Sequence, residues 1–176
     1  MVDSKNISQL NTITLLFFLI IFIFNSGKEE AQIIPYKVPF GYTVKGNVAR
    51  VIDGDTFVLT DSEHVRLLGI DTPELDGSDS FYVFYATKAR YLTDSLINGK
   101  RVKLTFDGPT RDIFGRILAY VWLTDIKGRD SLFIQAELLK TGFARIRYYP
   151  KGKRYYDVFY NLRRTAMKQN LGIWSK

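Results

Sequence analysis

The sequence of 176 residues contains no cysteine, and this absence removes several classes of protein at once. Without cysteine there can be no disulfide framework, no zinc cluster built on thiolates and no thiol nucleophile. A single histidine, His64, is present. Mechanisms that need two imidazoles, or a metal held by several histidines, are therefore excluded. His64 itself is interpreted as an ordinary strand residue.

Long hydrophobic runs are also scarce, and the one present lies near the amino terminus. Ile13 to Phe24 is an almost unbroken apolar run of 12 residues, a length that fits the core of a signal peptide better than a bilayer span. Counting from Leu10 to Gly27 gives 18 residues, so an uncleaved signal-anchor remains open. We expect residues 1–27 to direct export, either as a cleaved signal peptide or as a membrane tether through residues 10–27. The protein would then be secreted, or anchored facing outside the cytoplasm.

The rest of the chain divides into a short linker and one domain. Residues 28–41 carry Pro35, Pro39 and Gly41 among mixed charges, which predicts a linker. Residues 42–176 suit a single compact domain. The net charge of +7 favours polyanionic partners. Residues 53–79 hold eight acids and one base, whereas residues 140–168 hold nine bases and one acid. This separation suits a metal-dependent enzyme acting on a polyanion, although charge alone favours the simpler explanation of two solvated faces of opposite sign.

Apolar periodicity predicts an α+β, β-rich fold: a five-stranded OB-fold barrel with about three helices, preceded by the amino-terminal hydrophobic segment. The Asp53-Gly54 turn predicts a hairpin between the first two strands. One helix begins at Asp79 or Ser80 and ends near Ile97, a short one opens at Asp130 and ends at Gly142, and the last spans roughly residues 155–169. The expected strands are 43–52, 56–60, 64–70, 101–106 and 116–123. The first helix is expected to bury Tyr85, Ala89, Leu92 and Leu96, and the second Leu132, Ala136 and Leu139.

Two carboxylates stand out because each lies next to a turn at the end of a strand. Asp55 belongs to Asp53-Gly54-Asp55-Thr56, and Asp71 to Asp71-Thr72-Pro73-Glu74. Side chains at such positions can converge on one mouth of a barrel. With no histidine or cysteine nearby, ligation through oxygen alone selects a hard cation, Ca²⁺ or Mg²⁺. Taken singly, a plain hairpin turn and a capped turn would also explain the two motifs.

Two arginines accompany these acids. Arg66 lies within an otherwise apolar strand, and Arg116 follows the Phe114-Gly115 bend. Guanidinium groups stay protonated and bind in a planar fork, so they suit the charge that develops on a phosphodiester during hydrolysis. Taken alone, Arg66 could be an edge residue that extends its charge into solvent, and Arg116 an ordinary charge at a strand end.

Together the three segments, the last being Arg111 to Arg116, resemble the staphylococcal nuclease (thermonuclease) family in kind, order and spacing. The resemblance runs from about Val44 to Trp174. It implies Ca²⁺, with Mg²⁺ the lesser candidate, held by Asp55, Asp71 and the main-chain carbonyl of Thr72. It further implies that Glu74 activates or orients the attacking water and that Arg66 and Arg116 clamp the phosphate. The implied activity is a sugar-nonspecific endonuclease that cuts DNA and RNA to products with 3′-phosphates.

The chain departs from the family's pattern in one loop. Family members commonly carry Asp-Lys-Tyr-Gly-Arg where this chain has Asp112-Ile113-Phe114-Gly115-Arg116. A lysine and a phenolic hydroxyl that could contact the terminal phosphate are therefore missing, which puts substrate affinity in doubt more than the reaction.

The basic and aromatic segment from Arg145 to Tyr156 suits the phosphates and stacked bases of a single strand. Its substrate-binding candidates are Tyr148, Arg147 and Lys151, and a solvated loop with core tyrosines is the alternative. We expect DNA and RNA as partners, with unpaired strands preferred, and a monomer with no obligate protein partner. The alternative function is a non-catalytic nucleic-acid-binding module of the same fold.

Overall fold

The structure is a computed structural model that describes residues 41–176. The predicted export segment, residues 1–27, and residues 28–40 of the predicted linker lie outside the described residues. Within residues 41–176, no helix combines the length and the apolar character that crossing a bilayer requires.

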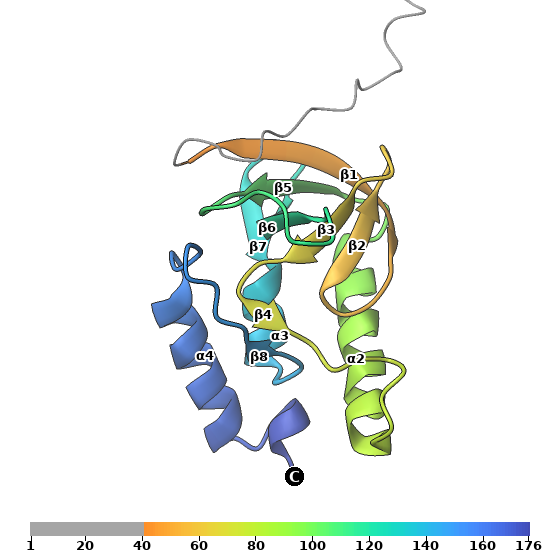
Figure 1. The fold of residues 1–176 in the computed structure, drawn as a ribbon, viewed down its shortest axis with the longest axis vertical. Helices are drawn as coiled ribbons and strands as arrows, with labels where there is room; N and C mark the ends of the chain where they lie inside the picture. The colour runs from red at the N-terminus through yellow and green to blue at the C-terminus, as the bar shows by residue number, and fades with distance from the viewer. Residues whose placement is uncertain (1–40) are drawn as a thin grey trace, which may run out of the picture. The chain divides into compact units, whose positions relative to one another are not determined.

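A closed barrel of five strands forms the centre of the described fold (Figure 1). Neighbouring strands follow the order β3-β2-β1-β5-β6, and β3 also pairs in parallel with β6, which closes the barrel. The predicted five-stranded barrel is thus confirmed, with the expected hairpin between its first two strands. Its strands are β1 (Thr43–Val51), β2 (Thr56–Leu59), β3 (His64–Leu67), β5 (Arg101–Thr105) and β6 (Ile117–Thr124).

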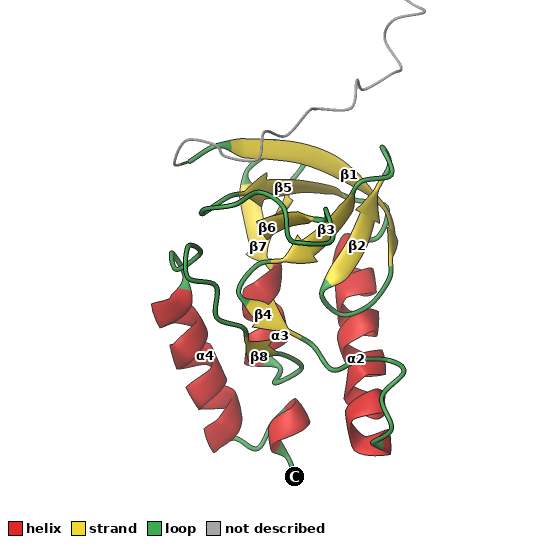
Figure 2. Cartoon of the chain, in the orientation of Figure 1, coloured by secondary structure: helices red, strands yellow, loops and turns green. Residues whose placement is uncertain are grey.

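Three short strands and the helices complete the described fold. The helices gather beyond one end of the barrel (Figure 2). Two of the short strands, β4 (Ile70–Asp71) and β8 (Arg145–Ile146), pair with each other outside the barrel. The third, β7 (Asp130–Phe133), extends the sheet beyond β6. The helices are α2 (Ser80–Ile97), α3 (Ile134–Lys140), α4 (Tyr156–Lys168) and a short 3₁₀ turn at Gly172–Trp174.

The prediction of a helix opening at Asp130 is wrong. Residues 130–133 form strand β7, and the helix starts only at Ile134. The reason is tertiary: Phe133 pairs with Trp122 on β6, and the two rings stack with their centroids 4.2 Å apart. That cross-strand aromatic contact favours an extended backbone before the helix begins. Leu132 consequently belongs to the sheet and not to a helix face.

The buried face of α2 is rotated relative to the prediction. The helix is capped as expected, because the Asp79 side chain accepts a hydrogen bond from the Phe81 N–H. Its buried residues, however, are Ala86, Ala89, Thr93 and Ile97. The hydroxyl of Thr93 donates to the carbonyl of Gly54 at 2.7 Å. A Cβ atom at Gly54 would lie 2.6 Å from that of Ala89, so only glycine allows this close approach. The helix therefore fixes the turn that precedes Asp55.

The predicted third strand, residues 64–70, is interrupted at its end. Gly69 has a φ of +88°, which separates β3 from β4 and redirects the chain. A Cβ at this position would also lie 2.8 Å from the ring of Phe159 on α4. Because of this bend, Ile70 and Asp71 turn back toward the side chain of Arg66, which bonds to both of them. The bend is thus the local feature that assembles the site.

Candidate active site

Asp55 is a buried carboxylate held by hydroxyl and amide donors. Its side chain accepts hydrogen bonds from the Thr72 N–H at 2.7 Å, the Thr72 hydroxyl at 3.1 Å and the Thr56 hydroxyl at 3.2 Å. Burial raises the pKa of Asp55 to about 6, against the opposing attraction of Arg66. An acid with a raised pKa lies where additional positive charge would be favourable. Asp55 therefore fits the role of a cation ligand.

Arg66 is the residue that brings the acids together. It is only 4% exposed, and its Nη1 donates to the carbonyls of Leu67 and Ile70, each at 2.9 Å. Its Nη2 donates to Asp71 Oδ1 at 2.6 Å and forms an ion pair with Asp55 Oδ2 at 3.1 Å. Two predicted cation ligands thus meet at one guanidinium nitrogen. The interpretation of Arg66 as an edge residue that reaches into solvent is wrong.

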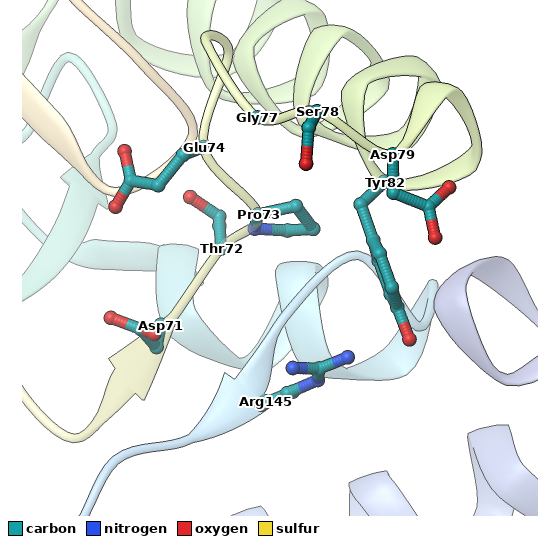
Figure 3. A pocket seen from close by; sticks show the side chains of 9 residues that line it. All are labelled: Asp71, Thr72, Pro73, Glu74, Gly77, Ser78, Asp79, Tyr82 and Arg145. Carbon is teal, nitrogen blue, oxygen red and sulfur yellow. The ribbon is translucent and has the colours of Figure 1, made fainter.

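Glu74 lies two residues beyond Thr72, on the rim of a pocket of about 330 Å³ (Figure 3). One side of this pocket is lined by a single short segment that includes Asp71, Thr72 and Glu74. Glu74 is largely exposed to solvent. The part of its carboxyl that is buried, and then the nearby charges of Asp55 and Asp71, raise the pKa of that carboxyl. A carboxylate with a raised pKa and access to solvent can accept a proton from water.

The donor set fits a hard cation. Two carboxylates and a main-chain carbonyl supply oxygen alone, which is the preference of Ca²⁺ and Mg²⁺. Across residues 41–176, no three acidic, histidine or cysteine side chains gather as a metal cluster. A hard cation at this point would be held by Asp55, Asp71 and the carbonyl of Thr72.

Arg116 is placed by a separate, tightly bonded loop. Its Nε donates to Asp112 Oδ2 at 2.7 Å, and Asp112 Oδ1 accepts the main-chain N–H groups of Phe114 and Arg116. In the parallel β3–β6 pair, Arg66 lies opposite Leu118, two residues after Arg116. Arg116 thus lies directly before β6, the strand that pairs with β3, which carries Arg66. Asp112, which sequence reasoning did not single out, sets the side-chain direction.

The three predicted substrate-binding residues lie in different surroundings. Arg147 bonds to Asp71 Oδ1 at 3.1 Å, so it belongs to the acid cluster. Tyr148 is 59% exposed, with its ring beside that of Tyr156. Lys151 is exposed and lines a second, mainly apolar pocket of about 230 Å³ that also includes Leu118. The structure does not bring the three together, and their roles in substrate binding stay predictions.

Arg145 and Tyr82 line the main pocket and were not among the predicted site residues. In the β4–β8 pair, Arg145 lies directly opposite Asp71. The alternation Arg145-Ile146-Arg147 could have indicated two arginines on one face. The pairing with Asp71 has no signal in the sequence, because β4 and β8, the strands that pair residues 71 and 145, are only two residues long each.

The chain is similar in sequence to known proteins over most of its described part. The family described as "Staphylococcal nuclease homologue" matches residues 64–176. The thermonuclease of Staphylococcus intermedius is 36% identical over 132 residues, which cover 73% of this chain and 75% of that protein. The thermonuclease of Staphylococcus hyicus is 32% identical over 131 residues, covering 73% and 74%. The SPbeta prophage-derived endonuclease YokF of Bacillus subtilis is 38% identical over 132 residues, 72% of this chain but 43% of that longer protein.

Proposed function

The chain belongs to the staphylococcal nuclease family and is a nuclease of that family, and we propose that it is a Ca²⁺-dependent endonuclease that hydrolyses the phosphodiester bonds of both DNA and RNA. The proposed products carry 3′-phosphates, and unpaired strands are the preferred substrate. The observation that carries the proposal is the Arg66 guanidinium, which is buried and bonded to both Asp55 and Asp71 beside Glu74.

The proposed division of labour follows from these contacts. A Ca²⁺ ion held by Asp55, Asp71 and the Thr72 carbonyl would supply positive charge to the phosphate when bound. Glu74 accepts or orients the proton of the attacking water, for which its raised pKa suits it. Arg116 donates to the phosphate oxygens once its guanidinium leaves Asp112.

Arg66 has a narrower role than the sequence indicates. Both of its terminal nitrogens already bond to protein atoms. Among the described residues, its Nε has no protein acceptor, so one N–H remains for a phosphate oxygen. We therefore assign Arg66 chiefly to positioning Asp55 and Asp71, with its charge and one donor directed at the substrate.

We also propose that the protein acts outside the cytoplasm. The support is the apolar run from Ile13 to Phe24, which has the length of a signal-peptide core. Fractionation of the native host, with detection of the chain, tests this proposal. Recovery from the cytoplasm alone would contradict it.

Glu74→Gln separates the proposed enzyme from a binding module. The full-length chain, in a non-ionic detergent, is incubated with single-stranded DNA in Ca²⁺ and then in chelator. We expect cleavage by the native chain in Ca²⁺ only, and a kcat about 10²- to 10⁴-fold lower for Glu74→Gln, because water activation is lost.

The matched control is Glu137→Gln on α3, whose one ion pair within residues 41–176, to Lys140, spans 3.9 Å. It removes the same charge away from the pocket and should cut at the native rate. Binding of DNA by the native chain without any cleavage would favour the non-catalytic module instead.

A further inference from the structure

The pocket beside Glu74 extends well past the reacting groups. From Asp71, Thr72 and Glu74 it continues along the loop to Asp79 and Tyr82, with Arg145 on the opposite side (Figure 3). Its volume of about 330 Å³ exceeds what an attacking water needs. The far end, between Tyr82 and Arg145, has no role in the proposed reaction.

Arg145 and Arg147 have different partners, although Arg145 lies on β8 and Arg147 directly follows it. The register places Arg145 opposite Asp71, and Arg147, two residues on, lies on the same face. Arg147 bonds to Asp71. The Arg145 guanidinium instead lies over the ring of Tyr82, 4.9 Å from its centroid. Among the described residues, no carboxylate forms an ion pair with Arg145.

Two of the three acids that line the pocket are already compensated by other cations. Asp71 is bonded to Arg66 and Arg147, and Asp79 pairs with Lys176 at 3.1 Å. The charge of Arg145 is therefore available to a ligand. A guanidinium presents planar, paired N–H donors, which match the oxygens of a phosphate, and an aromatic ring beneath it limits its motion.

We propose that Arg145, supported by Tyr82, is a second phosphate-binding subsite, which takes the phosphate next to the scissile one on the same strand. The inference rests on the proposed function, because it treats the pocket beside Glu74 as the path of the polynucleotide. Arg145 is here a specificity residue: it favours substrates with several phosphates over those with one. A free phosphate ion would bind to Arg145 through the same chemistry. Comparing substrates of different length distinguishes such an ion from a phosphate that belongs to the polynucleotide.

The salt dependence of binding gives a direct test. Single-stranded oligonucleotide is titrated into the full-length chain in detergent and chelator at several salt concentrations, with anisotropy as the readout. Loss of one phosphate contact on a single strand lowers the slope of log affinity against log salt by about 0.7. We expect this decrease for Arg145→Gln and the native slope for Arg145→Lys, which keeps the charge.

Lys127→Gln is the matched control, since Lys127 is exposed in the loop between β6 and β7 and its loss changes the net charge equally. It should leave the slope unchanged. A native slope in Arg145→Gln, or an equal decrease in Lys127→Gln, would overturn the subsite.

If Arg145→Gln fails to fold, Tyr82→Leu replaces it in the titration. We expect this variant to bind the oligonucleotide about three-fold more weakly with the salt slope retained. Native affinity would overturn the role of the ring.

Cleavage assays separate this subsite from the proposed function. Arg145→Gln should raise the KM for an oligonucleotide about five- to ten-fold with kcat nearly unchanged, and leave a dinucleotide, which has one bridging phosphate, unaffected. Equal effects on both substrates would overturn the subsite. A native chain that binds but cuts neither substrate would overturn the enzyme proposal, while the salt test would still decide the fate of the subsite.

Discussion

Two arginines reach the same oxygen of Asp71 from different regions of the molecule. Arg66 comes from strand β3 of the barrel and has 5% of its side chain exposed, whereas Arg147 follows β8 outside the barrel and has 55% exposed. Arg66 is held by four contacts, and Arg147 by one ion pair and the adjacent ring of Tyr149. Arg66 is therefore a fixed charge that organises the acids, whereas Arg147 is exposed and held by fewer contacts, so its side chain is the more movable of the two.

The largest expected effect concerns stability. Arg66→Met removes the partner of two acids, one of them buried, and we expect the free energy of unfolding to fall by about 3–5 kcal/mol. Arg147→Met removes an exposed pair and should cost less than about 1 kcal/mol. Urea denaturation in chelator measures both. Equal losses would show that the two regions do not differ as described.

A second prediction concerns Asp55, whose pKa is raised to about 6 in the fold. Between about pH 4 and pH 6 the folded protein keeps a proton that the unfolded chain releases. The contribution of this group to stability is therefore present at low pH and is lost as the pH rises through 6. Asp55→Asn should consequently be more stable than the native chain at pH 7 in chelator, by about 2–3 kcal/mol.

The difference between Asp55→Asn and the native chain should vanish near pH 3, where the Asp55 carboxyl is protonated in both the folded and the unfolded protein. Denaturation at the two pH values provides the measurement. An Asn variant less stable than the native chain at pH 7 would contradict the raised pKa. Added Ca²⁺ should stabilise the native chain and leave the variant unchanged, because the variant lacks an anionic ligand.

The smallest expected effect sharpens the role of the movable arginine. Arg147→Gln frees one oxygen of Asp71 and removes a competing positive charge, so Ca²⁺ should bind up to about five-fold more tightly. Titration calorimetry without substrate measures this change. Arg129→Gln, which removes an exposed arginine paired with Asp125, is the control and should bind Ca²⁺ like the native chain. Unchanged or weaker binding in Arg147→Gln would mean that this arginine does not compete with the cation.

Much of the fold was predictable because it depends on local patterns. The Asp53-Gly54 turn, the cap at Asp79 and the alternation of apolar residues in the barrel strands each indicate an element from a few neighbouring residues. The helix predicted at Asp130 failed because Phe133 packs on Trp122, a partner from another strand. The prediction of which face of α2 is buried was wrong for the same kind of reason, because Thr93 is buried where its hydroxyl bonds to the carbonyl of Gly54.

The candidate site divides in the same way. The residue types and their positions drew attention to Asp55, Asp71 and Arg66, and the resemblance to the nuclease family added Glu74. The structure brings both aspartates to Arg66 and places Glu74 at the pocket rim. Sequence reasoning did not single out Tyr82 or Asp112, and it named Arg145 only as the start of a basic segment. Their importance depends on which residue lies opposite or beneath each of them, and local periodicity carries no information about such partners.

The sequence by itself determined the chemistry available to this protein: oxygen ligands without sulfur or a second imidazole, permanently charged arginines, and an acidic segment separated from a basic one. Only the tertiary structure decided which arginine holds the acids and which two are left exposed beside them. The physical reason is that closing the barrel and bending the chain at Gly69 bury Arg66 among acceptors. The pairing of β4 with β8 places Arg145 opposite Asp71 in the register and leaves Arg145 and Arg147 exposed.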